Sequence, residues 1–220
     1  MNFLQLCQRV ASKAGITTSG ILTTVGQQGE ALRIVNWVQD DYIDIQEKND
    51  NWFFLRKDFE FTCVPGQSVY PKETIANFGN WLTEDIRCYL STQQDEQWLE
   101  EKSWRDFKAT RLMGSARTVP GRPQDYAIKP DKSFVTYPIP NDYYIINGEY
   151  YQSARLFTGD TDVPLFDQHH MVIVYQALMF YAAYSSDAAV YADSQKNYER
   201  LIDKLEINQM DELELSGSLA

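Results

Sequence analysis

The chain is poor in the residues that disulfide frameworks and metal sites require. Its 220 residues include only three cysteines and two histidines. Cys7, Cys63 and Cys88 form an odd set without CxxC spacing, so we expect reduced thiols. The first ten residues also lack the basic start and long apolar core of a signal peptide, which predicts synthesis in the cytosol.

A long apolar run is also missing. The most apolar stretch covers residues 171–184, includes Gln176, and is shorter than the roughly 20 residues that span a bilayer. Its apolar side chains cover nearly the whole circumference of a helix. We therefore expect a helix buried on several sides, in a core or an interface, and no membrane partner.

Positive charge is in the minority, with 20 lysines and arginines against 31 acidic residues and a net charge of -11. Such a balance argues against gripping nucleic acid through a broad basic face. The local exception is formed by Lys108, Arg111, Arg117 and Arg122, which could contact phosphate or an acidic partner. A local basic patch of this kind is more often a solvated loop.

Recognisable catalytic motifs are absent from the sequence, which contains no GxGxxG, GxxxxGK[ST], GxSxG or HExxH. His169 and His170 are adjacent, and neighbouring residues on a helix point about 100° apart, so they cannot chelate one metal as an i, i+4 pair can. We expect first-turn helix residues or interface contacts, with no metal and no cofactor.

Two pairs of acids resemble the carboxylates of glycoside hydrolases only in sequence. They are Asp160 with Asp162 and Glu100 with Glu101. Proximity along the chain does not set the separation of carboxyl groups that hydrolysis needs. We interpret all four as solvated loop acids and expect no catalytic activity.

Helical periodicity marks the first 58 residues. A short helix carrying Phe3, Cys7 and Val10 should end at Gly15, and residues 16–28 should form an exposed loop. A longer helix should cover residues 29–48. Its apolar stripe contains Ala31, Ile34, Val35, Val38, Tyr42 and Ile45, and the acids Asp40, Asp41, Asp44 and Glu47 should lie largely outside it.

Strand periodicity marks residues 59–166. Residues 59–63 and 69–70 should pair as a hairpin around Pro65 and Gly66, and residues 85–91 should form another strand. Ser103 should cap a short helix at 104–113, which Gly114 ends. Residues 135–137 and 143–151 should form a tyrosine-rich hairpin that completes the sheet, with its turn at 140–142. Gly148 is then a bulge, although Asn147 and Gly148 also suit a tight turn.

Helices return at residues 167–212. Asp167 should cap the apolar helix, and a second stripe defines the last helix, before residues 213–220 trail off as a flexible tail. The stripe contains Ala188, Tyr191, Ala192, Tyr198, Leu201, Ile202 and Leu205. The sequence thus predicts one structural unit of the α+β class, mainly α. A bundle of N-terminal helices (1–58) and a C-terminal pair (167–212) carries an inserted antiparallel β-rich region (59–166).

The order of five segments resembles that of the adaptor, or head-to-tail connector, proteins of tailed bacteriophages. The segments are NDNWFFLRKDFEF, VPGQSVYP, RPQDYAI, VTYPIPNDYYIINGEYY and TDVPLFDQHH. The resemblance implies a structural virion protein, assembled as a ring of twelve copies beneath the portal protein. Such a ring extends the channel through which DNA passes and offers a platform for tail or nozzle proteins.

Two small sets of residues are candidates for the implied contacts. Phe180 and Tyr181, on the apolar helix, should lie at the interface between subunits. Leu213 and Leu215 alternate with acids and should dock on the portal by strand addition. Two other functions remain open, namely a tail-associated cell-wall hydrolase and a monomeric cytosolic binding module.

Overall fold

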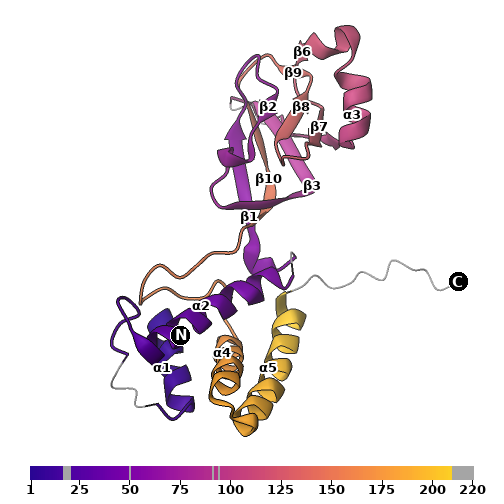
Figure 1. The fold of residues 1–220 in the computed structure, drawn as a ribbon. Coiled ribbons are helices and arrows are strands. Elements are labelled where there is room, and N and C mark those ends of the chain that lie inside the picture. Colours follow the sequence, from indigo (N-terminus) through magenta and orange to yellow (C-terminus); the bar gives the residue numbers. More distant parts are fainter. Residues whose placement is uncertain (17–20, 50, 91, 94, 210–220) are drawn as a thin grey trace, which may run out of the picture. The chain divides into compact units, whose positions relative to one another are not determined.

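The chain folds into two compact units (Figure 1). A computed structural model describes residues 1–16, 21–49, 51–90, 92–93 and 95–209. The helical unit consists of Met1–Leu55 with Ala154–Ala220, and the β unit consists of Arg56–Ser153. The fold is therefore α+β, as the sequence predicts.

The apolar helix of the sequence is the central helix of the helical unit. The four helices of this unit are α1 (Phe3–Lys13), α2 (Gly29–Glu47), α4 (Met171–Ser185) and α5 (Ala188–Gln209). Only α4 contacts all three others closely, which accounts for the apolar residues that are buried on it. Asp167 does not cap this helix: the cap position is His170, and it makes no side-chain cap bond. Phe53–Leu55 forms a short 3-10 turn.

Local signals at the first helix agree with its structure. Asn2 and Gln5 form a reciprocal capping box at the start of α1. Gly15 follows the helix with φ +73°, in the left-handed region where glycine carries no steric penalty. The following loop is less exposed than the sequence suggested, because Ile21 and Thr24 are buried.

Aromatic stacking anchors residues 154–166, which follow the β unit along the chain, in the helical unit. The ring of Phe157 stacks between those of Phe3, at 4.6 Å, and Tyr42, at 4.1 Å. The Leu165 amide donates to the Tyr42 hydroxyl at 3.0 Å. Residues 154–166, which the sequence grouped with the β-rich insertion, therefore belong to the helical unit.

Asp41 is fully buried on α2, and neither of its carboxylate oxygens has a hydrogen-bond partner among the described residues. The expectation that it lies outside the apolar stripe was wrong. Val38, Asp41 and Ile45 follow one another at spacings of three and four residues and so share one helix face. Burial, followed by the charges of Asp44 and Asp40, raises the pKa of Asp41 to about 9, so this group is protonated at neutral pH.

The β unit contains two four-stranded sheets and a separate strand pair. The first sheet has the order β1 (Arg56–Thr62), β10 (Tyr144–Gln152), β3 (Phe78–Leu90) and β4 (Gln97–Trp98). The second has the order β2 (Val69–Tyr70), β8 (Phe134–Tyr137), β7 (Asp125–Ile128) and β5 (Glu100–Glu101). The pair consists of β6 (Pro120–Gly121) and β9 (Ile139–Pro140).

Both predicted hairpins are wrong in their pairing. β1 pairs with β10, whereas β2 pairs with β8 in the other sheet. The turn at Pro65 and Gly66 exists and is closed by the Gln67 amide, which donates to the Val64 carbonyl at 3.0 Å. The Tyr70 hydroxyl supports it by donating to the Gln67 carbonyl at 2.7 Å. β8 and β10, the two strands of the expected tyrosine-rich hairpin, likewise lie in different sheets. Local alternation predicts strands, but their partners depend on which faces meet in the core.

The insertion is not wholly antiparallel, because β5 pairs with β7, and β6 with β9, in parallel. The parallel pairing of β5 and β7 needs a crossover, which α3 (Trp104–Arg111) and the 3-10 helix η4 (Gly114–Thr118) supply. Ser103 caps α3 as predicted, since its side chain accepts from the Asp106 amide at 3.1 Å. A second 3-10 helix covers Lys72–Thr74.

The predicted irregularity at Gly148 is present. β3 has four residues between Leu82 and Arg87 where β10 has only Gly148 between their partners, so the excess lies on β3. A Cβ at Gly148 would lie 3.0 Å from a ring carbon of Phe59 and 3.1 Å from Ile86. Glycine thus allows β1 and β3 to close over this point of β10.

Aromatic rings fill the space between the two sheets. Trp81 of β3 lies 5.0 Å from Phe59 and 5.3 Å from Phe134, and Phe134 stacks on Tyr126 at 4.9 Å. Cys63 and Cys88 are buried in the same core as free thiols, and Cys7 is buried in the helical unit. Burial raises the pKa of Cys63 to about 11 and those of Cys7 and Cys88 to about 12.

Replacing Asp41 with Asn should raise the melting temperature at pH 7 by several degrees. The folded state keeps the Asp41 proton up to about pH 9, whereas the unfolded chain releases it near pH 4. The unfolded state thus binds fewer protons in this window, and stability falls as pH rises from about 4 to about 9. In a chain of this size, a gain of about 1 kcal/mol in the free energy of unfolding raises the melting temperature by about 2–4 °C.

Thermal melts from pH 4 to pH 9 check this expectation. The difference between Asp41→Asn and the wild type should widen as pH rises through the window. Glu47→Gln, an exposed substitution on the same helix, should follow the wild-type curve. A difference that stays constant over this pH range would show that Asp41 does not hold its proton in the folded state.

The cysteines should be inert in the folded protein. Dithiothreitol should leave the melting temperature unchanged, because no disulfide is present to reduce. Iodoacetamide at pH 8 should label none of the three thiols until denaturant is added, because buried thiols with raised pKa values form little thiolate. Mass spectrometry counts the adducts, and rapid labelling of native protein would contradict the burial of these residues.

Candidate functional site

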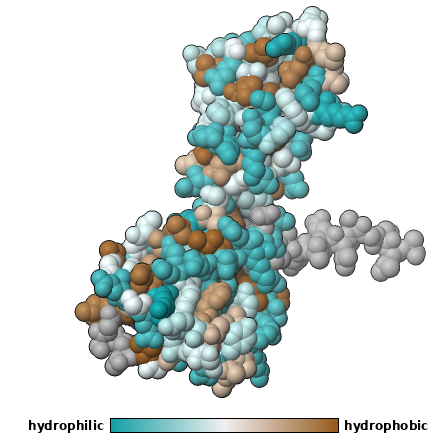
Figure 2. Space-filling view, viewed as in Figure 1, coloured by the Kyte–Doolittle hydropathy of each residue, from teal (hydrophilic) through white to brown (hydrophobic). Residues whose placement is uncertain are grey.

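Part of α4 remains exposed in the helical unit. Phe180 is 42% exposed and Tyr184 is 57% exposed. One side of the helix is packed, and its buried residues are Val172, Ile173, Val174, Ala177, Leu178 and Ala182. Apolar groups also appear on the outer surface of the molecule (Figure 2). α4 therefore carries more apolar surface than the single chain covers.

The two predicted interface residues differ in their surroundings. The ring of Tyr181 meets the ring of Trp37 edge-on at 6.4 Å, so Tyr181 already packs against α2. Tyr184 lies 6.1 Å from the same Trp37 ring, and the Arg33 guanidinium sits 4.4 Å over Tyr184. Phe180 has no ring contact of this kind among the described residues. Phe180 is therefore the better candidate for contact with another chain.

A shallow hollow lies at the turn between α4 and α5. Its volume is about 280 Å³, and small side chains and one tyrosine line it. They are Ala182, Ala183, Ser186, Asp187, Ala188 and Tyr191. Such a lining suits an apolar side chain from a partner better than a polar substrate.

The two histidines have separate structural contacts. His169 Nε2 lies 3.2 Å from Asn208 Nδ2, and His170 Nε2 lies 2.7 Å from the carbonyl of Phe166. Burial lowers the pKa of His170. Within the described ranges, no group of three or more His, Cys, Asp or Glu residues could hold a metal ion.

Three of the four acids in the two predicted pairs have structural contacts. Asp160 accepts hydrogen bonds from the amide of Thr24, at 2.7 Å, and from its hydroxyl, at 2.5 Å. Asp162 accepts from the Thr158 amide at 2.6 Å. These bonds lower the pKa of both carboxyl groups and hold two loops in place. On β5, Glu100 pairs with Lys102.

The predicted basic cluster divides into two parts. Arg111 pairs with the buried Asp125 at 2.7 Å, and Arg122 donates to the Cys88 carbonyl at 2.7 Å and pairs with Asp95. These two arginines stabilise the β unit. Lys108 and Arg117 are exposed, and so is Arg105 on the same helix.

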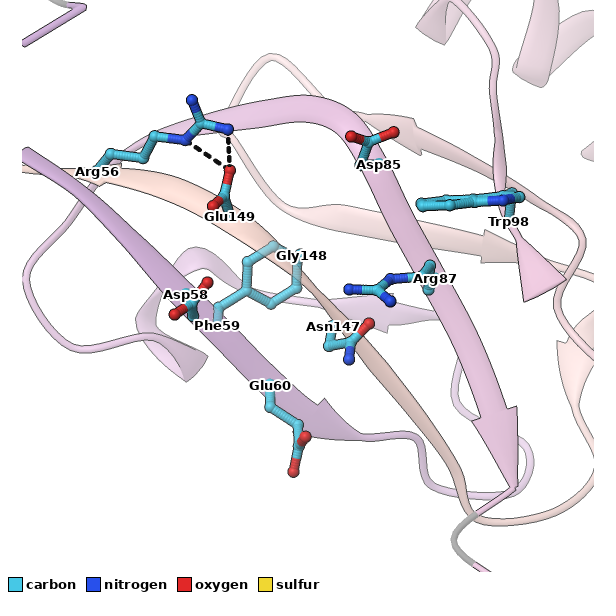
Figure 3. A pocket seen from close by; sticks show the side chains of 10 residues that line it. All are labelled: Arg56, Asp58, Phe59, Glu60, Asp85, Arg87, Trp98, Asn147, Gly148 and Glu149. Carbon is cyan, nitrogen blue, oxygen red and sulfur yellow. Dashed lines mark hydrogen bonds and ion pairs between the residues drawn. The ribbon is translucent and has the colours of Figure 1, made fainter. Parts of the chain in front are cut away.

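A polar hollow of about 470 Å³ lies on the outer face of the first sheet (Figure 3). One row of its residues crosses all four strands in register, consisting of Glu60, Asn147, Arg87 and Trp98. Asp58 and Glu149 face each other in a second row across β1 and β10. The hollow lies beside the backbone of Gly148, where β3 bulges.

Carboxylates outnumber cations in this hollow. The Arg56 guanidinium pairs with Glu149, as Figure 3 shows, and Arg87 lies 5.3 Å from the Trp98 ring. Asp58 and Asp85 have no ion pair within the described part of the chain, and Glu60 accepts only from the Tyr89 hydroxyl, at 3.2 Å. Trp98 is 62% exposed. The hollow can therefore receive a cationic group and an apolar one together.

Sequence reasoning missed this hollow although one of its signals was visible. The alternation of charged and aromatic residues in β1 predicts a charged outer face. Only the long-range register of β10 and β3 brings that face beside Arg87 and Trp98.

The predicted portal-binding residues Leu213 and Leu215 lie outside the described residues. No helix within the described ranges is long and apolar enough to cross a membrane.

No curated protein matches the sequence. One family model, described as SU10 adaptor protein, matches residues 1–219, which is almost the entire chain. The chain therefore belongs to the SU10 adaptor protein family, a family of phage head-tail adaptors.

Proposed function

We propose that this adaptor assembles as a ring between the portal protein and the tail of a phage. The ring extends the DNA channel and gives tail or nozzle proteins a platform, with twelve copies as the number that the resemblance implies. The protein acts through its surfaces rather than by catalysis. Family membership supports the location at the head-tail junction.

The observation that carries the proposal is the uncovered surface of α4. A helix that is apolar on nearly every side is expected where a core meets a neighbouring subunit. Phe180 and Tyr184 remain exposed although the same helix contacts α1, α2 and α5. A second copy packed there would remove this apolar area from water.

The charge distribution agrees with the passage of DNA without capture. The helical unit carries eight basic and seventeen acidic residues, against twelve and fourteen in the β unit. An acidic wall repels phosphates and lets the duplex slide. We place the DNA-facing surface on the helical unit for this reason.

Replacing Phe180 with Asp should prevent ring formation while leaving the monomer folded. The side chain is 42% exposed, so the new charge stays hydrated in the free chain but would be buried without a partner in the assembly. Circular dichroism reports the fold. Negative-stain images and sedimentation of the protein with purified portal rings report the assembly.

Two control variants separate folding from assembly. Leu178→Asp, at a buried position on the same helix, should unfold the helical unit. Val64→Asp, at an exposed apolar position in the β unit, should assemble like the wild type. Normal rings from Phe180→Asp would remove the argument that this surface is an interface.

Deleting residues 213–220 should weaken capture by portal rings. The described core of the helical unit lies before residue 210, so helical content and melting temperature should stay near wild type. Leu213 and Leu215 are proposed to place alternate side chains in portal pockets, with main-chain hydrogen bonds between them. A pull-down with portal rings measures the loss.

The matched control for the deletion keeps the length of the tail. Leu213→Ser with Leu215→Ser should weaken capture as the deletion does, because the pockets lose their apolar occupants. Equal capture of the full chain and of both variants would place the portal contact on the folded body instead.

A further inference from the structure

Three exposed cations of the β unit lie on one segment, residues 104–118. It contains Arg105, Lys108, Arg111 and Arg117 and a single acid, Asp106, in a chain whose net charge is -11. Arg105, Lys108 and Arg117 are exposed. None of these three forms an ion pair with another described residue. Their charge is available to a partner.

This basic segment is held rigidly. Phe107 is fully buried against Ala127 and Val135 of β7 and β8, so α3 is fixed on the second sheet. The ion pair between Arg111 and Asp125 anchors the last turn of the helix. A fixed segment loses little conformational entropy when it docks.

Apolar side chains accompany the cations. Met113 is 66% exposed and Val119 is 39% exposed, at the two ends of η4. A mixture of exposed apolar groups and arginines is typical of protein interfaces rather than of solvated loops. The segment therefore has the composition of a docking surface.

The polar hollow on the first sheet has the complementary chemistry. Asp58, Glu60 and Asp85 present carboxylates that form no ion pair with a described residue, although Arg56 and Arg87 also line the hollow. The exposed ring of Trp98 lies at one side of them. The basic segment carries three exposed cations with apolar neighbours. The hollow carries three carboxylates with an aromatic neighbour, so the two surfaces are complementary in charge and in apolar character.

The two surfaces belong to different sheets of the β unit. The basic segment packs on β7 and β8, whereas the hollow is built on β1, β10, β3 and β4. No ion pair joins them within the described part of the chain. Contact between unlike surfaces of two copies is heterologous and passes from copy to copy around a ring.

We propose that the basic segment 104–118 of one copy docks in the acidic hollow of the next. This inference rests on the proposed ring and names one of its contacts. Arg105 and Lys108 face Asp58 and Asp85, and Met113 packs on the Trp98 ring. The carboxylates of the hollow make it a poor site for nucleic acid, which favours a second copy of the chain as the occupant.

Charge reversal on either surface tests the contact. In one variant Arg105 and Lys108 become Glu, and in the other Asp58 and Asp85 become Lys. Each alone places like charges together and should lower the fraction of chain assembled with portal rings by about tenfold or more. Combining both changes in one chain restores opposite charges and should return assembly to within about threefold of wild type.

The control reversals are Lys72→Glu and Glu73→Lys, which lie on an exposed 3-10 helix of the same unit. Both should assemble like the wild type. Circular dichroism of every variant shows whether the β unit remains folded. A single reversal that unfolds the protein is replaced by the neutral pair Arg105→Gln and Lys108→Gln, which should weaken assembly without repulsion.

The outcomes separate this inference from the proposed function. If the wild type fails to form rings with portal, the proposed function fails. If the wild type forms rings and the combined variant is not restored, the docking fails while the ring stands. A different result would overturn the inference. If reversing Arg105 and Lys108 abolishes retention of double-stranded DNA, and adding the reversal of Asp58 and Asp85 does not restore it, residues 104–118 bind nucleic acid instead.

Discussion

The pairing of β1 with β10 is the constraint on which both units depend. It places Arg56 opposite Tyr151 at the two ends of the insertion, although nearly a hundred residues separate them along the chain. The chain can therefore leave the helical unit after Leu55 and return to it at Ala154. Closing so long a loop costs entropy, which the ladder and the aromatic core beneath it offset.

The same ladder creates the polar hollow. One face of β1 supplies Phe59 and Phe61 to the core, so its other face must carry Asp58 and Glu60 to solvent. Gly148 lets the strands close over Phe59, and the bulge in β3 opens a depression beside it. The packing of aromatic residues on the core face of this sheet thus determines which charged residues lie on its solvent face.

Electrostatics act differently in the two units. In the helical unit Asp41 is buried without a hydrogen-bond partner among the described residues and holds its proton, so it weakens the fold as pH rises. In the β unit the buried carboxylate of Asp125 forms an ion pair with Arg111. Charged groups without such a partner lie on the surface of this unit. Surface charge that forms no ion pair within the described part of the chain is available for contacts between chains.

Local sequence determined the helices, the Ser103 cap, the glycine that follows α1 and the apolar character of residues 171–184, because each depends on neighbours within one or two turns. It also carried the order of segments from which the adaptor family is identified. Only tertiary structure decided the partners of β1, β2 and β10, the burial of Asp41 and the hollow, because these depend on contacts between residues distant in sequence. Strand alternation indicates which face is buried but not which strand lies beside it, and that choice is made when whole faces meet in the core.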